Sequence, residues 1–196
     1  MDGPEPASFA APSSADEDAE VADVSRLVAR ARAGDREAFA AFHGRFDRFV
    51  HAVLLAHAPP AEVDDLHQEV FVSAWRHLDS LQQDERAGAW LATIARRAAA
   101  RQRATLVHHH ELPEQLEDPR TRSSANAAGG LDGAHLLTVL RALPEAYRET
   151  LALRLVEGFT GPEIATATGL THGSVRVNLH RGMQLLREKL REEGYA

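Results

Sequence analysis

The chain has 196 residues, no cysteine and a formal net charge of -7 at pH 7. The lack of cysteine excludes disulfide bonds, thiolate metal sites and thiol nucleophiles. Hydrophobic residues make up 44% and charged residues 26%, the balance of a globular protein that buries a core. No apolar run reaches the roughly 18 residues of a membrane span, and the first residues lack a basic region followed by an apolar stretch. We therefore expect a cytoplasmic protein without membrane insertion.

The acidic charge is concentrated in two segments. Residues 1–20 hold six acidic residues and no basic one, and residues 105–133 hold five acidic and two basic residues. Both are rich in Ala, Ser, Pro or Gly, which predicts a disordered acidic tail and an acidic flexible linker of roughly 28 residues. Residues 21–104 and 134–196 instead carry apolar residues at helical spacing. The sequence predicts an all-α fold of two small helical domains.

Four helices are expected in residues 21–104. A short helix from Ser25 to Ala33 ends at Gly34, and Asp35 caps the next one. Pro59 and Pro60 end that second helix and lead into a third that begins near Ala61. A polar loop over 79–86 precedes the fourth. The expected core positions are Phe39, Phe42, Phe46, Phe49, Val50 and Val53, then Val63, Leu66, Val70, Phe71, Ala74 and Leu78, then Trp90, Leu91, Ile94 and Ala98.

Charged residues of these helices allow two interpretations each. The acidic start of the third helix, which includes Asp64 and Asp65, is either simple complementarity to the helix dipole or a face for a protein partner. On the fourth helix, i,i+4 and i,i+7 spacings predict that Arg96, Arg97, Arg101 and Arg103 share a basic face. With Trp90, such a face could hold single-stranded DNA, although core packing is the simpler role for the Trp90 ring.

Residues 134–196 have the pattern of a helix-turn-helix. Pro144 suits a helix start and Gly158 the helix end, after which Thr160 and Glu163 form a capping-box pattern. A second short helix ends at Gly169. Thr171 then caps a third helix, whose expected inward residues are Val175, Leu179, Leu186 and Leu190.

This last helix carries the strongest functional signal. Between Ser174 and Arg191 the sequence has one acidic residue, Glu188, and five basic ones: Arg176, Arg181, Arg187, Lys189 and Arg191. A basic helix of this kind binds phosphates and reads bases from its N-terminal end. The alternative is a solvated face of a helical bundle.

Catalytic and metal-binding patterns are nearly absent. No Gly-rich phosphate loop, Gly-x-Ser-x-Gly motif or zincin motif occurs. His108, His109 and His110 form the one histidine run, but they fall in the expected linker without a spaced second pair. We predict no enzyme activity, no cofactor and no metal site.

The ordered motifs resemble the extracytoplasmic-function (ECF) group of sigma-70-type RNA polymerase sigma factors. Residues 64–76, DDLHQEVFVSAWR, resemble the region 2 signature, and residues 90–96, WLATIAR, continue it. Region 4 is resembled by five short segments: Leu143-Pro144-Glu145, 157–160, 163–165, 173–176 and 179–181. The likeness covers both predicted domains and implies a factor that directs core polymerase to promoters and assists melting.

The resemblance also implies what each surface binds. Partners would be the clamp helices of the polymerase largest subunit and its flap region, promoter DNA and an anti-sigma protein. The implied core-binding residues are Asp64, Asp65, Gln68, Glu69, Val72 and Arg76. The implied minus 10 contacts are Asp79, Ser80, Arg86, Trp90, Arg96, Arg97, Arg101 and Arg103. The implied minus 35 contacts are Thr171, His172, Gly173, Ser174, Arg176, Val177, Asn178, His180 and Arg181.

The sequence departs from the family pattern at a few positions. Arg97 and Arg101 stand where the family commonly has Asn and Asp, while Asn178 and Met183 replace positions that are often basic. The acidic tail is not part of the pattern; it either shields basic surfaces or only aids solubility. The rival functions are a stand-alone helix-turn-helix regulator, a sigma-like protein that sequesters a partner and, last, an enzyme with a site in the bundle core.

Overall fold

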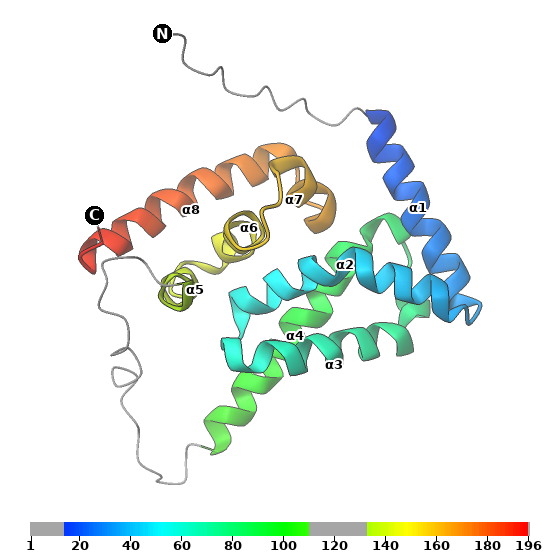
Figure 1. Ribbon diagram of the computed structural model, residues 1–196, viewed down its shortest axis with the longest axis horizontal. Coiled ribbons are helices and arrows are strands. Elements are labelled where there is room, and N and C mark those ends of the chain that lie inside the picture. Colours follow the sequence, from blue (N-terminus) through cyan, green and yellow to red (C-terminus); the bar gives the residue numbers. More distant parts are fainter. Residues whose placement is uncertain (1–13, 110–132, 196) are drawn as a thin grey trace.

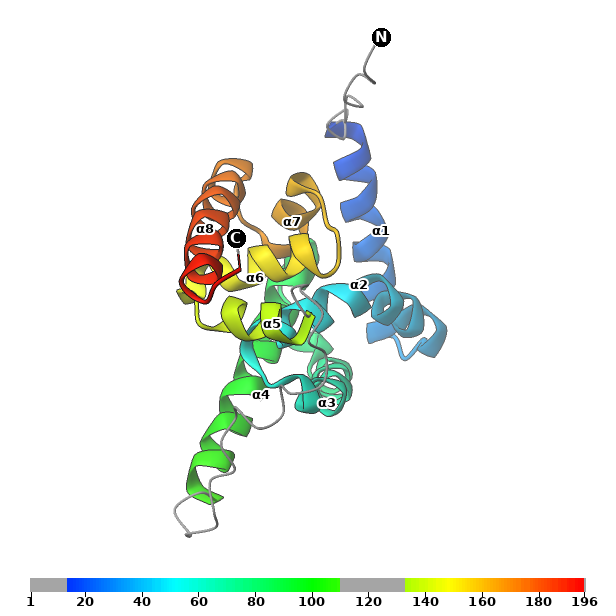
Figure 2. The same ribbon diagram turned by 60° about the vertical axis from the view of Figure 1, so that its left-hand side comes forward.

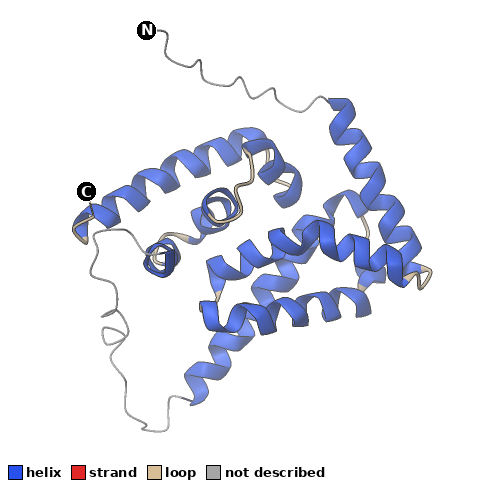
Figure 3. Ribbon diagram, in the orientation of Figure 1, coloured by secondary structure: helices blue, strands red, loops and turns tan. Residues whose placement is uncertain are grey.

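The computed structural model describes residues 14–109 and 133–195, and all regular structure in these ranges is helical (Figure 3). The first domain contains α1 (Ser14–Arg32), α2 (Arg36–His57), α3 (Val63–Arg76) and α4 (Ala87–His109). The second contains α5 (Gly133–Arg141), α6 (Glu145–Leu155), α7 (Gly161–Thr168) and α8 (His172–Glu192). The predicted all-α, two-domain fold is confirmed.

Local signals in the sequence set several helix ends. Gly34 has a φ of 87°, which only glycine adopts without strain, and this conformation ends α1. Asp35 then caps α2, because its carboxylate accepts hydrogen bonds from the backbone N–H groups of Glu37 and Ala38 at 3.0 Å. The two prolines open a 3-10 turn, Pro60–Glu62, that leads into α3. Short 3-10 turns, Leu78–Ser80 and Asp84–Arg86, replace the polar loop predicted between α3 and α4.

The predicted helix-turn-helix is present in the second domain. Thr160 and Glu163 form a reciprocal capping box at the start of α7. Gly169, with a φ of 72°, ends α7 in the left-handed conformation. Thr171 accepts a hydrogen bond from the Ser174 N–H at 3.1 Å and thereby caps α8.

Two helices extend beyond their predicted limits. α1 begins at Ser14 rather than Ser25, so residues 14–20 of the expected tail are helical. α4 continues to His109, so residues 105–109 of the expected linker are helical too. No Gly or Pro interrupts 14–33 or 89–112, and composition alone underestimated how far each helix propagates. Residues 1–13 and 110–132, including His110, lie outside the described residues.

The two domains share one continuous buried cluster. Phe42, Phe49 and Leu91 are fully buried in the first domain, as are Leu151 and Ile164 in the second. Between the domains, α2 packs against α5 and α6, and α4 packs against α7. α8 lies on the outer side of the second domain, away from α1–α4 (Figures 1 and 2). Within the described ranges, no helix is both long and apolar enough to cross a membrane.

Candidate nucleic-acid interface

The outward face of α8 is open. Val175, Gly182 and Leu186 are buried on the inner face. Gly182 is needed there, because a Cβ would lie 2.9 Å from the Leu151 side chain. On the outer face, four exposed side chains line an open hollow: Arg176, Val177, His180 and Arg181.

The other predicted minus 35 residues lie around this hollow. Thr171, His172, Gly173 and Ser174 are exposed at the start of α8, and Asn178 is half-buried. Met183, which replaces a position that is often basic in the family, packs against the core. Because its side chain turns inward, a basic residue there would not reach a phosphate without moving.

The predicted core-binding residues form one exposed face of α3. Asp64, Asp65, Gln68, Glu69, Val72 and Arg76 are all exposed. Val72 is 49% exposed, although it is apolar, and Trp75 is 38% exposed. Apolar side chains among charged ones are typical of a protein-binding surface.

The segment 78–84 between α3 and α4 is held from α1. The Arg32 guanidinium donates to the Leu78 carbonyl at 3.4 Å and to the Leu81 carbonyl, and it forms an ion pair with Asp84 at 3.0 Å. Within the same segment, the Ser80 hydroxyl donates to the His77 carbonyl at 2.7 Å. Arg32 therefore fixes the segment that carries Asp79 and Ser80, and the motif pattern had not singled it out.

The arginines of α4 do not share one face, so that prediction was wrong. Arg96 points to the second domain, where it pairs with Glu149, while Arg101 pairs with Glu69 on α3. Arg97 and Arg101, four residues apart, lie on one side of the helix. Arg96 and Arg103, seven residues apart, lie on another side. Arg97 and Arg103 are exposed. Trp90 is half-buried and packs against the core, which agrees with the simpler interpretation of its ring.

Glu149 of α6 joins the two domains through polar contacts with α2 and α4. Its Oε1 lies 2.8 Å from His57 Nε2 and accepts from Arg96 Nε at 2.5 Å, and its Oε2 accepts from the second Arg96 nitrogen at 3.1 Å. Burial acts to raise the pKa of Glu149, but the hydrogen bonds from His57 and Arg96 outweigh it and lower the pKa from 4.5 to about 2. The carboxylate therefore stays charged at neutral pH.

Further polar contacts join α2 to the second domain. Glu157 accepts from Arg48 Nε at 2.9 Å and lies 2.8 Å from His51 Nδ1. The Arg48 guanidinium also lies 5.5 Å from the centre of the Phe159 ring, within range of a cation–π interaction.

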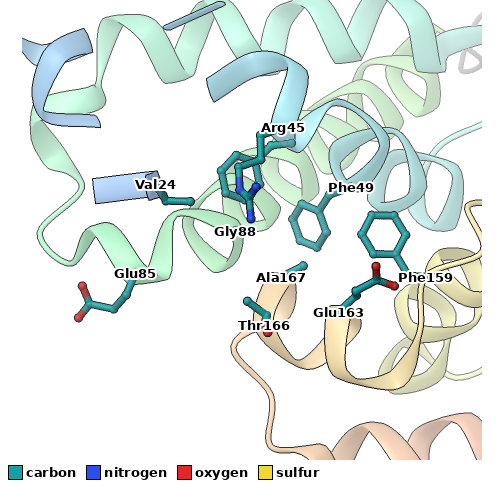
Figure 4. A pocket seen from close by; sticks show the side chains of 10 residues that line it. Val24, Arg45, Phe49, Glu85, Gly88, Phe159, Glu163, Thr166 and Ala167 are labelled. Atoms are coloured by element: carbon teal, nitrogen blue, oxygen red, sulfur yellow. The ribbon is translucent and has the colours of Figure 1, made fainter. Parts of the chain in front are cut away.

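A cavity of about 170 Å³ lies beside this contact (Figure 4). Phe49 lines it from the first domain and Phe159 from the second. Near it, the backbones of α4 and α7 come so close that a Cβ on Gly88 would lie 2.0 Å from the Ala167 carbonyl oxygen. The interface therefore combines tight backbone contact with an imperfectly filled space.

Sequence reasoning missed the residues that join the domains. Glu149 and Glu157 stand alone in helical patterns, and nothing in their spacing indicates a partner about 50 to 110 residues away in the chain. A buried carboxylate needs such a partner, but burial itself follows from the tertiary packing.

The chain matches two family models. Sigma-70 region 2 matches residues 42–106, which cover α3 and most of α2 and α4. Sigma-70, region 4 matches residues 135–186, which include the helix-turn-helix. The first matched segment lies within α2–α4, without α1, and the second lies within α5–α8.

Curated relatives and a solved structure agree with this assignment. The RNA polymerase sigma factor CarQ of Myxococcus xanthus is 36% identical over 137 residues, which are 67% of this chain and 76% of CarQ. The ECF RNA polymerase sigma-E factor of Escherichia coli strain K12 is 27% identical over 179 residues, 84% of this chain and 92% of that protein. CnrH, in its complex with the cytosolic domain of CnrY, shares the fold at 23% identity and a TM-score of 0.56, over 88% of this chain and 99% of CnrH.

Two region models in the expected order and a relative of this similarity determine the family. Its members are initiation factors without enzymatic activity of their own. The chain belongs to the ECF subfamily of sigma-70-type RNA polymerase sigma factors, and it directs RNA polymerase to promoters.

Proposed function

We propose that this sigma factor uses four surfaces during initiation. The exposed face of α3 binds the clamp helices of the polymerase largest subunit, and the second domain binds near the flap. Segment 79–86 and α4 engage the melted minus 10 element, and α8 reads the minus 35 element as duplex. The observation that carries this proposal is the open outer face of α8, whose inner face is packed against its own domain.

The α8 surface has the chemistry of duplex recognition. Arg176 and Arg181 supply positive charge for phosphates or for guanine edges, and Val177, 43% exposed, can contact a thymine methyl group. His180 lies between them in the same hollow. Residues 171–174 near the helix start are exposed, and side chains at this end of a recognition helix contact bases in the major groove.

The minus 10 surface requires a prearranged segment. Flipping a base costs a few kcal/mol, so a pocket that is already formed lowers the cost of capturing the base. Arg32 supports this role, since it holds the carbonyls of Leu78 and Leu81 and the carboxylate of Asp84. Three further arginines are exposed and can contact the melted DNA strand: Arg86, Arg97 and Arg103.

The domains must separate before the whole minus 10 surface is usable. Arg96, one of the proposed DNA contacts, is held by Glu149 of the second domain. The interface includes the ion pairs of Glu149 and Glu157 and leaves a cavity of about 170 Å³, features of a contact that can open. We propose that the closed arrangement is the free form, and that polymerase and promoter favour an open form with Arg96 released.

An in vitro transcription assay tests this function. The purified chain, core polymerase and genomic DNA should give new transcript start sites. Val72→Glu should abolish binding to core but leave duplex binding intact, whereas the double variant Arg176→Ala, Arg181→Ala should bind core and lose promoter selection. Arg26→Ala, which removes one charge from α1, is the control.

Two results would contradict the proposal. Duplex binding with no new start sites from folded protein would favour a stand-alone regulator. Full activity of the α8 double variant would favour a protein that sequesters a partner. We also propose a cytoplasmic location and an anti-sigma protein as an inhibitory partner, as family membership implies; co-purification from cells would test the partner.

A further inference from the structure

Three potential metal ligands meet where α2 and α3 pack together. His43 and Asp47 lie one turn apart on α2, and His67 lies on α3. His67 Nε2 is 3.4 Å and His43 Nδ1 is 3.9 Å from the same oxygen, Asp47 Oδ1. All three ligand atoms lie within 4.8 Å of one another. The sequence analysis had predicted no metal site, because only the fold brings His67 to the other two.

The separations are close to those of a coordinated ion. Zn²⁺ binds His nitrogen at about 2.0–2.1 Å and carboxylate oxygen at about 2.0–2.2 Å, so tetrahedral ligands lie roughly 3.3 Å apart. The His67 to Asp47 distance already agrees with this value. His43 needs to move closer to the other two ligands, and its side chain, 41% exposed, has room to turn.

Both imidazole rings are oriented by the same aromatic side chain. The centre of the Phe71 ring lies 4.0 Å from that of His43 and 5.0 Å from that of His67. His67 is also largely covered by its neighbours, since its side chain is only 15% exposed. Because His67 is held in this way before the ion arrives, it loses less conformational entropy on binding, which favours affinity.

We propose that His43, Asp47 and His67 form a binding site for a borderline divalent transition metal, with Zn²⁺ as the best fit. Two imidazoles and one carboxylate suit Zn²⁺, Ni²⁺ or Co²⁺ better than Mg²⁺ or Ca²⁺, which prefer oxygen ligands. The chain has no cysteine, so soft thiolate coordination is excluded. The fourth position faces the solvent side, where Asp47 is 48% exposed, and takes water or a ligand from a partner.

Coordination of an ion by His67 replaces a hydrogen bond that His67 makes in its absence. His67 Nε2 now lies 3.2 Å from the Asp47 carbonyl oxygen, so its N–H donates there in the tautomer with the proton on Nε2. Metal binding at Nε2 requires the other neutral tautomer, so the proton moves to Nδ1 and the imidazole stays neutral. The ion then replaces a hydrogen bond between α2 and α3 with a coordinate link between the same helices.

The site also borders the surface proposed to bind core polymerase. Asp64, three residues before His67, is its exposed neighbour on α3 by helical spacing. A bound ion would fix α3 against α2 at that edge. This consequence rests on the proposed function, whereas metal binding itself does not.

Calorimetry with ZnCl₂ on the full chain tests the site. The histidine run is first removed by His108→Ala, His109→Ala and His110→Ala, because it could bind Zn²⁺ by itself. In this background we expect one Zn²⁺ per chain with a dissociation constant in the micromolar range. At about 100 times that concentration, the melting temperature should rise by roughly 5 °C or more.

Variants decide whether the ion lies at the proposed place. His67→Gln and Asp47→Asn, which nearly preserve side-chain size, should each weaken Zn²⁺ binding at least 10-fold while circular dichroism shows an intact helical fold. His77→Gln, at an exposed histidine just after α3, should leave the affinity unchanged. Co²⁺ should give the visible absorption of a tetrahedral complex, lost in His43→Ala.

The result that overturns the proposal is equally specific. It is wrong if the background protein binds no Zn²⁺ below about 100 μM, or if His67→Gln and Asp47→Asn bind as tightly as the background. Neither result depends on transcription, so a failure here is distinguishable from a failure of the proposed promoter function.

Discussion

α4 and α8 each carry basic residues proposed to bind DNA, but two of those on α4 are held in ion pairs, whereas Arg176 and Arg181 of α8 are exposed. On α8, Arg176 and Arg181 border an open hollow on the outside of the molecule. On α4, Arg96 is paired with Glu149 of the other domain and Arg101 with Glu69 of α3. The basic residues of the two helices therefore differ in their availability. We infer that duplex reading by α8 precedes the engagement of melted DNA by α4.

The largest effect should come from Gly88→Ala. A Cβ there would lie 2.0 Å from the Ala167 carbonyl oxygen, a backbone atom that cannot turn aside, so α4 and α7 must separate. Energy transfer between fluorescent labels on Gln82→Cys and Gln184→Cys, two exposed positions in a chain without native cysteine, should report a longer distance between the domains. Binding of minus 10 single-stranded DNA should rise at the same time.

The control for that substitution is Gly44→Ala. A Cβ on Gly44 meets no atom within 4 Å, so the domain distance should not change. An unchanged distance in Gly88→Ala would mean that the contact between α4 and α7 does not hold the domains together.

Acidification should open the domains next most strongly. The pKa of Glu149 is lowered to about 2 from 4.5, so its stabilising contribution is present above pH 4.5 and is lost as the pH falls through about 2. A shift of this size corresponds to roughly 3 kcal/mol. The same labels should show a domain distance that increases between about pH 4.5 and 2.

Glu149→Gln separates this effect from general acid unfolding. The neutral amide cannot titrate, so the variant should be partly open already at pH 7 and lose the acid-dependent step. If the wild-type and the variant follow the same acid curve while helicity remains, Glu149 is not the group that controls closure.

Arg181→Ala should weaken duplex binding by about 1–3 kcal/mol, with or without an open domain arrangement. If Arg181 contacts a phosphate, the slope of log affinity against log salt should also fall by about 1. Arg26→Ala removes the same charge from α1 and should change neither quantity. Titration of a labelled minus 35 duplex at several salt concentrations measures both the affinity and its salt slope. If the effect of Arg181→Ala changed in the Gly88→Ala background, duplex binding by α8 would depend on the domain arrangement, against this prediction.

Arg32→Lys should have the smallest effect, confined to the minus 10 segment. Lysine cannot reproduce the forked contacts to Leu78, Leu81 and Asp84, so stability should fall by about 1 kcal/mol. Hydrogen exchange of amides in 78–84 should become faster while α8 is unaffected. Arg36→Lys, at an exposed position at the start of α2, is the control, and equal exchange in both variants would remove Arg32 from this role.

The sequence by itself determined the helices and the surfaces that face outward. Apolar spacing placed Phe42, Phe49 and Val175 inside, and caps at Asp35, Thr160 and Thr171 fixed helix starts, because these signals act within one or two turns. For the same reason the exposed faces of α3 and α8 were predicted from spacing, although their binding roles stay predictions. Helix ends without a Gly or Pro, as in α1 and α4, were placed less well.

Only the tertiary structure decided which charged residues form ion pairs inside the molecule. Arg96 was predicted as a DNA contact, but its partner Glu149 is 53 residues away and meets it only because α6 packs on α2 and α7 packs on α4. In the same way, His43 and Asp47 share a helix face by spacing, while His67 joins them only where α3 packs on α2. Pairings between distant residues depend on how helices cross, and helix crossing is set by the whole core rather than by any local pattern.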